Sequence, residues 1–453
     1  MTDNSEPKEL PVTFHPALYL QRRGWVLDIM RREGVKEVLD VGCGEGELLS
    51  CLCNPAPWLA PPPQDVLPAD SASGDDAYTT VLAELHRDIL HPTKISGLDI
   101  CKADLDCTVR LTKPPPAEEN NEETKPLWHR APTRWEELEV DVWQGGLEHV
   151  NPAFVGVDCI VATEVIEHLP DRILDRFAPV LLGAYQPRLL LVTTPSYTFN
   201  ARFTAPDAPP SARSGWRDPT GRTARIFRHH DHKFEWTVDE FRAWCAAAAE
   251  AWGYEVAELG GVGRAQERDE WGRDEALGWA SQVAAFRRRD GVGWEARRAG
   301  RWAEEEEGLR RAETDEDEDA GAHRHQLLAT HRHPAHDAAG RPKPLDVVGE
   351  LVVATMVRFR ETAISLTEMW FEQEIERACG GLVDWLVRAI ERHDGLALRK
   401  TRLGSSTIPE WAVHLEPTLH HLIPPEPLVD AWATPPDTDE VEDLGDLFDD
   451  GDY

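Results

Sequence analysis

The chain has 453 residues, 41% of them hydrophobic and 29% charged, so it can form one large domain with additions or two domains. Its formal net charge of −34 counts against a nucleic-acid binder, a class that is usually basic. Much of this charge lies in acidic runs at 304–307, 313–319 and 437–453, which we expect to be solvated. The acidic net charge therefore does not exclude a locally basic groove elsewhere in the protein.

Cysteine usage and hydropathy predict where the protein works. The eight cysteines show no paired spacing typical of a disulfide framework, which favours free thiols in a reducing compartment. The first eleven residues lack the basic and then apolar pattern of a signal peptide. No apolar run reaches the roughly 18–20 residues that a membrane span needs. We expect a soluble intracellular protein, in the cytoplasm or alternatively in the nucleus.

Strand and helix patterns alternate along the first 290 residues. Predicted helices cover 15–32, 47–53, 79–90, 171–185 and 237–254. Predicted strands cover 36–42, 94–100, 138–145, 157–163, 188–195, 254–261 and 281–288. Such alternation predicts an α/β fold with a seven-stranded, mostly parallel sheet, in which we expect the last strand to be antiparallel.

Composition changes suggest the domain boundaries. We expect a disordered N-terminus over 1–11 and one α/β domain over 12–290, with Pro-rich or charged loop insertions at 55–76 and 113–126. The remainder divides by composition into a charged low-complexity linker, a helical extension and an acidic disordered tail, at 291–345, 346–425 and 426–453.

A glycine-rich loop follows the first predicted strand, in the stretch LDVGCGEGELL (39–49). Glycines let the backbone pass tightly under a ligand. The pattern D-x-G-x-G-x-G places Asp40 two positions before Gly42, and an acid there suits a ligand that carries an ammonium group and no phosphate, such as S-adenosylmethionine. Asp99, at the end of the second strand, is placed to accept hydrogen bonds from a ribose diol. The alternative is a purely structural turn.

Two further stretches gather potential metal ligands. EVIEH, directly after the fourth strand, holds Glu164, Glu167 and His168, which would share one face if the chain turns helical there. FRHHDHKFEWT (227–237) adds three histidines before a helix N-terminus, His232 among them. A mixed set of carboxylates and imidazoles suits Mg²⁺ or Mn²⁺ better than a thiolate zinc site. The alternative for EVIEH alone is a solvated helix N-terminus, where acids meet the helix dipole favourably.

These motifs, in this order, resemble the small-RNA 2′-O-methyltransferases, the family that methylates the 3′ ends of plant microRNAs and siRNAs and of animal piRNAs. The matching stretches are FHPALYLQR (14–22), VLDVGCGEGELL (38–49), SGLDI (96–100), ATEVIEHL (162–169), TTPSYTFN (193–200) and DHKFEWT (231–237). They span roughly residues 12–290. One departure is Ser196, where the family usually has asparagine.

The resemblance implies a Rossmann-like class I S-adenosylmethionine-dependent methyltransferase fold and a set of site residues. The implied metal ligands are Glu164, Glu167, His168 and His232. The predicted cofactor-binding residues are Asp40, Gly42, Gly44, Asp99 and Thr163. The implied cofactors are S-adenosylmethionine and Mg²⁺ or Mn²⁺. The implied substrate is the 3′ end of a small RNA, with an Argonaute-type protein as a candidate partner and a monomer as the expected state.

The expected reaction is methyl transfer to the terminal 2′-hydroxyl, which protects the RNA from tailing and degradation. A metal that holds both the 2′ and 3′ oxygens would select a free 3′ end without reading a base. His168 or His229 is expected to take the proton, and the choice between them stays open. Arg202, Arg225 and Arg228 are expected to hold the RNA backbone. The competing interpretations are a methyltransferase for a small diol such as catechol, and a catalytically silent RNA-binding scaffold.

Overall fold

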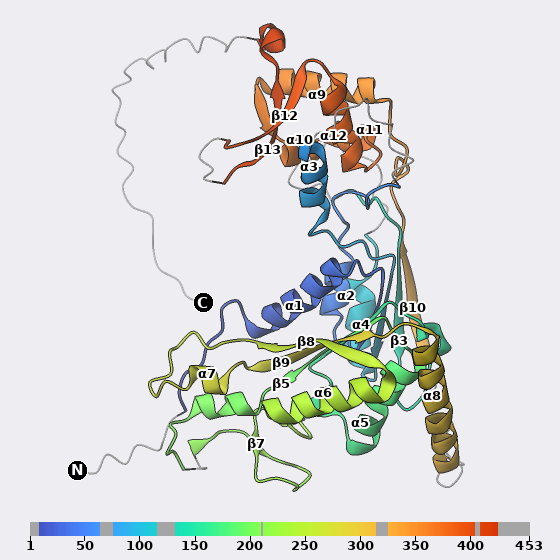
Figure 1. The fold of residues 1–453 in the computed structure, drawn as a ribbon, viewed down its shortest axis with the longest axis vertical. Helices are drawn as coiled ribbons and strands as arrows, with labels where there is room; N and C mark the ends of the chain where they lie inside the picture. The colour runs from blue at the N-terminus through green and yellow to red at the C-terminus, as the bar shows by residue number, and fades with distance from the viewer. Residues whose placement is uncertain are drawn as a thin grey trace, which may run out of the picture.

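The computed structural model describes residues 9–63, 76–115, 132–209, 212–313, 325–403 and 408–424. In Figure 1 these residues form a lower lobe around a large sheet and an upper lobe of helices with a small sheet. The predicted acidic tail at 426–453 lies outside the described residues, as do most of the insertion at 113–126 and residues 64–75 of the first insertion.

The lower lobe is built on one long sheet. Its strands are β1 (Glu37–Val41), β2 (Lys94–Asp99), β3 (Leu138–Gln144), β4 (Cys159–Thr163), β5 (Leu189–Pro195), β8 (Tyr254–Val262), β9 (Ser281–Arg288) and β10 (Gln326–His333). The helices of this lobe are α1 (Leu18–Arg32), α2 (Glu47–Leu52), α4 (Lys102–Leu111), α5 (Asp171–Ala178), α6 (Val238–Trp252), α7 (Asp274–Leu277) and α8 (Val292–Glu313).

Strand order determines where a ligand can bind. Among the described residues the sheet has eight strands in the order β10-β3-β2-β1-β4-β5-β9-β8. Strands β1 to β5 are parallel, and β9 runs antiparallel to both β5 and β8. The chain leaves β1 toward β2 on one side and later returns to β4 on the other, which makes a topological switch point. Open α/β sheets bind ligands at the carboxyl ends of the strands there.

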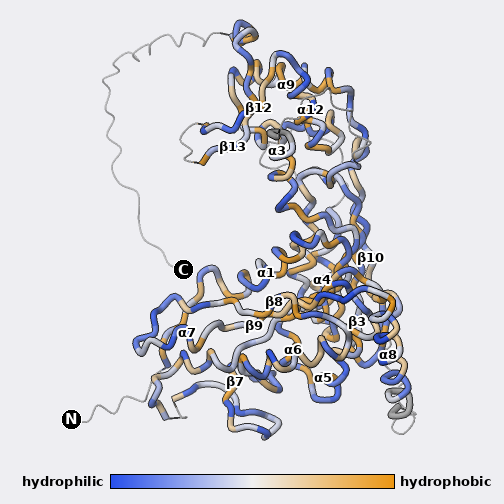
Figure 2. The backbone as a smooth tube through the Cα atoms, viewed as in Figure 1, coloured by the Kyte–Doolittle hydropathy of each residue, from blue (hydrophilic) through white to orange (hydrophobic). Residues whose placement is uncertain are grey.

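Alternating side chains cover both faces of the sheet, because successive residues of a strand point to opposite sides. On one face Val38, Ile95 and Val161 pack against α1, α2 and α4. On the other face Leu39 and Ile160 pack against α5 and α6. Figure 2 shows the hydrophobic residues gathered in these central strands. This is the Rossmann-like class I methyltransferase fold, so the predicted fold class and the antiparallel last strand are confirmed.

Two elements lie where the sequence predicts only a charged linker. Helix α8 and strand β10 fall within 291–345, and β10 pairs antiparallel with β3, so the sheet has one strand more than the predicted seven. Only one end of β10 is buried. An edge strand with an open face tolerates charged and histidine side chains, so its composition resembles that of a linker. Helix α4 also lies in a stretch whose sequence pattern predicts no element.

The upper lobe joins two distant parts of the chain. It contains α9 (Leu345–Phe359), α10 (Leu366–Trp370), α11 (Gln373–Ala378) and α12 (Val383–Arg392), with the strands β11 (Ala363–Ser365), β12 (Leu396–Thr401) and β13 (Glu410–Leu415). Helix α3 (Asp76–His86), which follows the first insertion, lies against it (Figure 1). Trp58 and Val81 share its buried core with Val348 and Trp370. The extension predicted as helical therefore also carries a three-stranded sheet.

The described helices include none that is both long and apolar enough to cross a membrane. The eight cysteines are all free in the structure, as their spacing predicts. Four of them, Cys43, Cys159, Cys245 and Cys379, are buried.

Candidate active site

The glycine loop connects β1 to α2 at the switch point of the sheet. Gly42, Gly44 and Gly46 all have positive φ angles, of 71°, 52° and 83°. A Cβ atom on Gly42 would lie 2.5 Å from Cγ2 of Val165, which belongs to the loop after β4. Glycine is therefore required at position 42 both by backbone conformation and by the close approach of a neighbouring loop.

Two acids lie at the ends of the adjacent strands β1 and β2, as predicted. Asp40 is only 3% exposed, and its Oδ1 has no hydrogen-bond partner among the described residues. Burial, together with the charge of Asp99, raises the pKa of Asp40 to about 8. Asp99 accepts hydrogen bonds from the backbone N–H groups of Gly44 and Cys101, at 3.0 and 2.8 Å. A cationic group near Asp40 would favour its charged form.

A cavity of about 380 Å³ opens beside this loop. Its lining includes Asp40 and Gly42 from the end of β1, and Thr163 and Glu164 from the end of β4. Gly44 and Asp99, also predicted to bind the cofactor, are not among its lining residues, and their bond to each other helps to hold the loop. The cavity thus connects the predicted cofactor loop with the first residue of EVIEH.

EVIEH does not form the helical turn that the sequence predicts. Glu164 has a φ of 54°, a left-handed conformation that is uncommon for a residue with a side chain. A single 3₁₀ turn, Ile166–His168, follows it. The interpretation that Glu164, Glu167 and His168 share one α-helical face is therefore wrong. Backbone strain of this kind persists where the surrounding structure holds it, and it is frequent at functional sites.

Hydroxyls from the end of β5 hold both glutamates. The Thr193 hydroxyl donates to Oε1 of Glu164 at 2.8 Å, and the Thr194 hydroxyl donates to Oε2 of Glu167 at 3.0 Å. Glu164 is half-buried and also pairs with Arg22, with Nη2 and Oε2 3.2 Å apart. Glu167 is fully buried, and its Oε1 has no partner among the described residues.

The electrostatics of the two glutamates favour a cation. Burial raises the pKa of Glu164, with partial compensation from Arg22. Burial, together with the charge of Glu164, raises the pKa of Glu167 well above its usual range. A buried oxygen without a partner is costly, and a pair of acids that resists ionisation marks a place where a positive ion would be stabilised.

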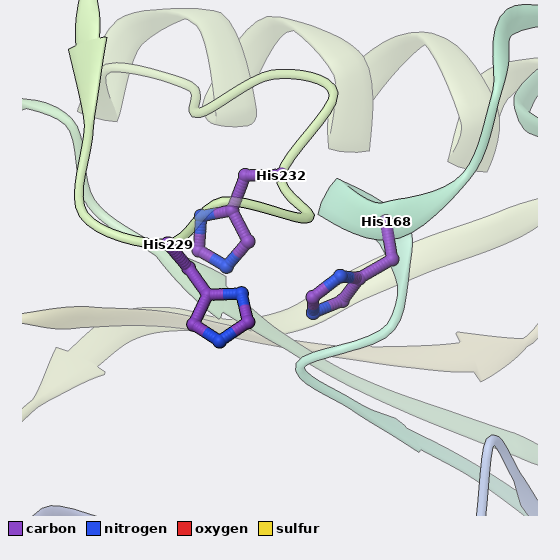
Figure 3. Close-up of side chains that lie close together, drawn as sticks. All are labelled: His168, His229 and His232. Carbon is purple, nitrogen blue, oxygen red and sulfur yellow. The ribbon is translucent and has the colours of Figure 1, made fainter. Parts of the chain in front are cut away.

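Three histidines converge next to the glutamates. One ring nitrogen from each of His168, His229 and His232 lies within 4.8 Å of the others. Figure 3 shows the three rings turned toward one another from two separate loops. The ring centroids of His168 and His232 are 4.9 Å apart, and those of His229 and His232 are 5.3 Å apart. His232 is buried, His168 is half-buried and His229 is exposed, so the cluster runs from the interior to the surface.

The environment of the cluster keeps nitrogen lone pairs available. Burial and the neighbouring His232 and His229 lower the pKa of His168 to about 4, so its ring is neutral at neutral pH. Nδ1 of His232 lies 2.7 Å from Oε1 of Glu235, a fully buried carboxylate. If Nδ1–H donates to this carboxylate, Nε2 is left as the free nitrogen. A carboxylate that orients a histidine in this way is typical of metal sites.

The described residues therefore fit a metal ion, with one difference from the predicted ligands. The sequence predicts Glu164 and Glu167 together with His168 and His232. The mutually close donor atoms belong to His168, His229 and His232, and neither glutamate is in that group. His232 nevertheless lies near enough to Glu164 for its charge to lower the pKa of that acid, and Glu167 supplies an unpartnered oxygen.

The three arginines predicted to bind RNA each pair with a carboxylate of the protein itself. Arg202 is 3% exposed and pairs with Asp269 at 3.3 Å, so it is not presented to a ligand. Arg225 makes two 2.8 Å bonds to the carboxylate of Glu240. Arg228 pairs with Glu9 at 2.7 Å. The prediction from local arginine density is corrected for Arg202, because a buried guanidinium requires internal partners.

Sequence reasoning missed several residues that shape the site. Arg22, Thr193, Thr194 and Glu235 all lie in stretches that carry the family resemblance, yet the sequence patterns indicate no specific role for them. The one feature of the sequence that indicates a role for these residues is their position inside motifs that also contain candidate site residues. Ser196, where the family usually has asparagine, is buried, and its hydroxyl has no partner among the described residues.

Comparisons with known proteins agree with this assembly of motifs. No protein-family profile matches the chain. It is 27% identical to a small RNA 2′-O-methyltransferase of Gallus gallus over 288 residues, which cover 63% of this chain and 58% of the relative. It is 30% identical to a protein of the same name from Xenopus tropicalis over 275 residues, which cover 61% of this chain and 56% of the relative.

A solved structure described as the small RNA methyltransferase HEN1 is 25% identical, with a TM-score of 0.41, and the match covers 63% of this chain and 27% of that one. The chain spans somewhat more than half the length of the chicken and frog relatives. The resemblance predicted from the sequence motifs is confirmed, and the chain is a relative of the small RNA 2′-O-methyltransferases.

Proposed function

We propose that this protein is an S-adenosylmethionine- and divalent-metal-dependent methyltransferase that methylates the 2′-hydroxyl of the 3′-terminal nucleotide of small RNAs. The observation that carries the proposal is the convergence of His168, His229 and His232. Glu164, whose pKa responds to the charge of His232, also lines the cavity beside the glycine loop. Relatives named small RNA 2′-O-methyltransferases support the same reaction.

In this proposal Asp40 faces the ammonium group of the cofactor, which lies over Gly42 and Thr163. Glu164, Glu167, His168 and His232 would hold the metal, with His229 as a further nitrogen at the exposed side. When bound, a divalent ion there supplies Lewis-acid activation of a ribose hydroxyl. Glu235 holds the ring of His232 in place through its 2.7 Å contact.

The chain's own groups position the acceptor and receive its proton. In-line displacement requires the hydroxyl to face the methyl group, and alignment of reactants is a large part of the rate advantage of such enzymes. We propose that the ring nitrogen of either His229 or His168 takes the proton. His229 is the more exposed of the two, and a neutral His168 has a lone pair available at neutral pH.

The proposal extends to biological context. Methylation at the terminal ribose would protect the small RNA from tailing and degradation. We propose that the enzyme works as a monomer in the cytoplasm, as its free cysteines favour, with an Argonaute-type protein as a candidate partner that presents the RNA end.

The test is transfer of a radiolabelled methyl group to short RNAs that share one sequence and differ at the 3′ end. We expect transfer to an RNA ending in a 2′,3′-diol, and none to its 2′-deoxy or 3′-phosphate counterpart. Catechol is assayed in parallel, and His232→Ala serves as the inactive control. Methylation of catechol without methylation of the diol RNA would replace this proposal with the small-diol methyltransferase.

A further inference from the structure

An exposed tryptophan lies beside the histidine cluster and plays no part in the proposed chemistry. Trp216 belongs to the two-residue strand β6 (Trp216–Arg217), which pairs antiparallel with β7 (Ile226–Phe227). Its side chain is 50% exposed. Burial of a large aromatic side chain is a major source of stability, so a half-exposed indole on a two-stranded ribbon is not explained by packing.

The Trp216 indole lies next to His229, which belongs to the histidine cluster of the proposed reaction centre. Its centroid is 6.4 Å from that of His229 and 5.9 Å from that of His230. His229 in turn lies 5.9 Å from His168 and 5.3 Å from His232. A nucleotide base is bonded directly to its ribose. If the ribose hydroxyls are held at the histidine cluster, the attached base must lie close by, where this aromatic surface is available.

The ribbon that carries Trp216 is held in a defined shape. Gly215, with a φ of 139°, packs so closely that a Cβ atom there would lie 2.2 Å from the carbonyl oxygen of Phe227. At the other end the Asp218 carboxylate accepts backbone N–H bonds from Thr220 and Thr223, at 2.8 and 3.0 Å. The indole is therefore presented on a rigid support, which lowers the entropy cost of stacking against it.

The same ribbon also carries a cation, which follows Trp216 in the chain and points to the opposite side of the strand. Arg217 is exposed and makes no ion pair in the part of the chain that the structure describes. Exposed aromatic rings combined with cationic side chains are typical of single-stranded nucleic-acid sites, where bases stack on the rings and cations follow the phosphates. The arginines predicted from sequence already pair with carboxylates of the protein, so the ribbon is the better candidate for this role.

We propose that Trp216 is a stacking platform for the base of the 3′-terminal nucleotide, an inference that rests on the proposed function and specifies how that site holds its substrate. A terminal base has no following base to stack on, and the indole takes that place. Since every base has a π-face, the platform favours a nucleotide end without selecting a sequence.

The test compares two RNAs of one sequence, one ending in an ordinary nucleotide and the other in an abasic ribose with an intact 2′,3′-diol. For the wild-type protein, loss of the base should raise KM by on the order of tenfold to hundredfold with little change in kcat. Trp216→Ala should raise KM for the ordinary RNA by a similar factor and should remove the difference between the two RNAs. Trp216→Phe should retain most of the discrimination.

The matched control is Trp271→Ala, which removes another exposed indole, 44% exposed, that packs against Arg273 instead of a histidine. It should leave the KM ratio of the two RNAs unchanged. If Trp216 only shields the histidines, Trp216→Ala will impair both RNAs equally, and the proposal is overturned. An unchanged KM for the ordinary RNA would overturn it as well.

A binding measurement separates this inference from the proposed function. An RNA with a 3′-terminal 2-aminopurine ribonucleotide should lose fluorescence on binding to the wild-type protein, because stacking quenches that base. Trp216→Ala should bind without this quenching. If quenching depends on Trp216 but the protein transfers no methyl group, the result supports the stacking platform and contradicts the proposed reaction. Equal quenching in the wild-type protein and in Trp216→Ala would contradict the stacking platform, whether or not methylation occurs.

Discussion

At the scale of single residues, Asp40 is a candidate cofactor-binding residue whose burial lowers the stability of the folded protein. The folded protein raises its pKa from 3.8 to about 8, through burial and through the charge of Asp99. Because the pKa is raised in the folded state, the contribution of Asp40 to the free energy of unfolding is most favourable below pH 3.8. This contribution is lost as the pH rises toward 8. At neutral pH the buried acid therefore weakens the cofactor-free protein.

We predict that Asp40→Asn stabilises the cofactor-free protein at pH 8 and weakens S-adenosylmethionine binding by roughly 10- to 100-fold, the effect of losing a charged partner. The gain in melting temperature should shrink on acidification and vanish below about pH 4. Calorimetric titration and thermal melts across pH check both halves. Unchanged cofactor affinity would remove Asp40 from the site, whatever happens to the melting temperature.

Glu235 provides a second prediction at this scale. Its carboxylate contacts Nδ1 of His232 at 2.7 Å and accepts the backbone N–H of Arg228 at 2.8 Å. Glu235→Gln keeps the size of the side chain but loses the charge that orients the imidazole. Metal affinity should fall on the order of 10- to 100-fold, as for other residues that support metal ligands.

Titration with Mn²⁺ measures this affinity directly. Binding of S-adenosylmethionine should stay unchanged, because Asp40 belongs to strand β1 and not to the loop that carries His232. Asp239→Asn is the matched control, since that carboxylate is exposed and pairs with Arg242. Wild-type Mn²⁺ affinity in Glu235→Gln would contradict the proposed metal centre, as would full methylation activity in the presence of EDTA.

At the scale of elements, the best-predicted feature is the start of α6. The sequence predicts Thr237 as its N-cap, and the structure has a full capping box, in which the Thr237 hydroxyl accepts from the N–H of Glu240 and the Glu240 carboxylate accepts from the N–H of Thr237. Arg225 binds the same carboxylate with two bonds. Since Thr237 lies five residues after His232, this cap also anchors the loop of the cluster.

The charge of Glu240 should make the stability of this helix start depend on pH. Its hydrogen bonds with Arg225, opposed by partial burial, lower the pKa of Glu240 from 4.5 to about 2. A lowered folded-state pKa contributes stability above pH 4.5 that is lost as the pH falls toward 2. This direction is opposite to that of Asp40.

Glu240→Gln should therefore be less stable than the wild type at pH 7 by a few tenths to about 1 kcal/mol, the usual value of an exposed ion pair. The difference should disappear as the pH approaches 2, which urea unfolding at several pH values measures. A constant difference from pH 7 to pH 2 would show that the lost interaction does not involve the charge.

At the scale of the whole molecule, the first insertion and the C-terminal extension share one hydrophobic core. Trp58 is 6% exposed and packs edge-on against Trp370, with centroids 6.1 Å apart. His86 of α3 contacts Asp384 of α12 at 2.9 Å, and both side chains are largely buried. The Trp370 indole donates to the carbonyl of Pro57 at 2.9 Å. Contacts between residues about 300 positions apart thus hold the upper lobe together.

Trp58→Ala should lower the free energy of unfolding by roughly 3–5 kcal/mol, the usual effect of truncating a buried aromatic residue. Because the damage lies in the upper lobe, that lobe should become the first part cut in limited proteolysis. The exposed Trp271→Ala should change stability by less than about 0.5 kcal/mol. Equal stability of the two variants would show that the insertion does not support the upper lobe.

The sequence by itself determined the central sheet and most of its helices. Strands β2, β3, β5 and β9 lie within one residue of their predicted bounds, because buried parallel strands are short apolar runs bounded by turn residues. It also indicated the glycine loop and the two glutamates and the histidines of the candidate site, since these residue types lie in closely spaced motifs.

Only the tertiary structure decided how these motifs combine. The left-handed Glu164, the addition of His229 to the cluster and the support of His232 by Glu235 depend on loops from β4 and β7 meeting in space. Charge density predicted exposed arginines, but burial of Arg202 depends on its contact with Asp269. The upper lobe depends on contacts between residues about 300 positions apart. Local patterns report propensity and periodicity, whereas such contacts are determined by the packing of the whole chain.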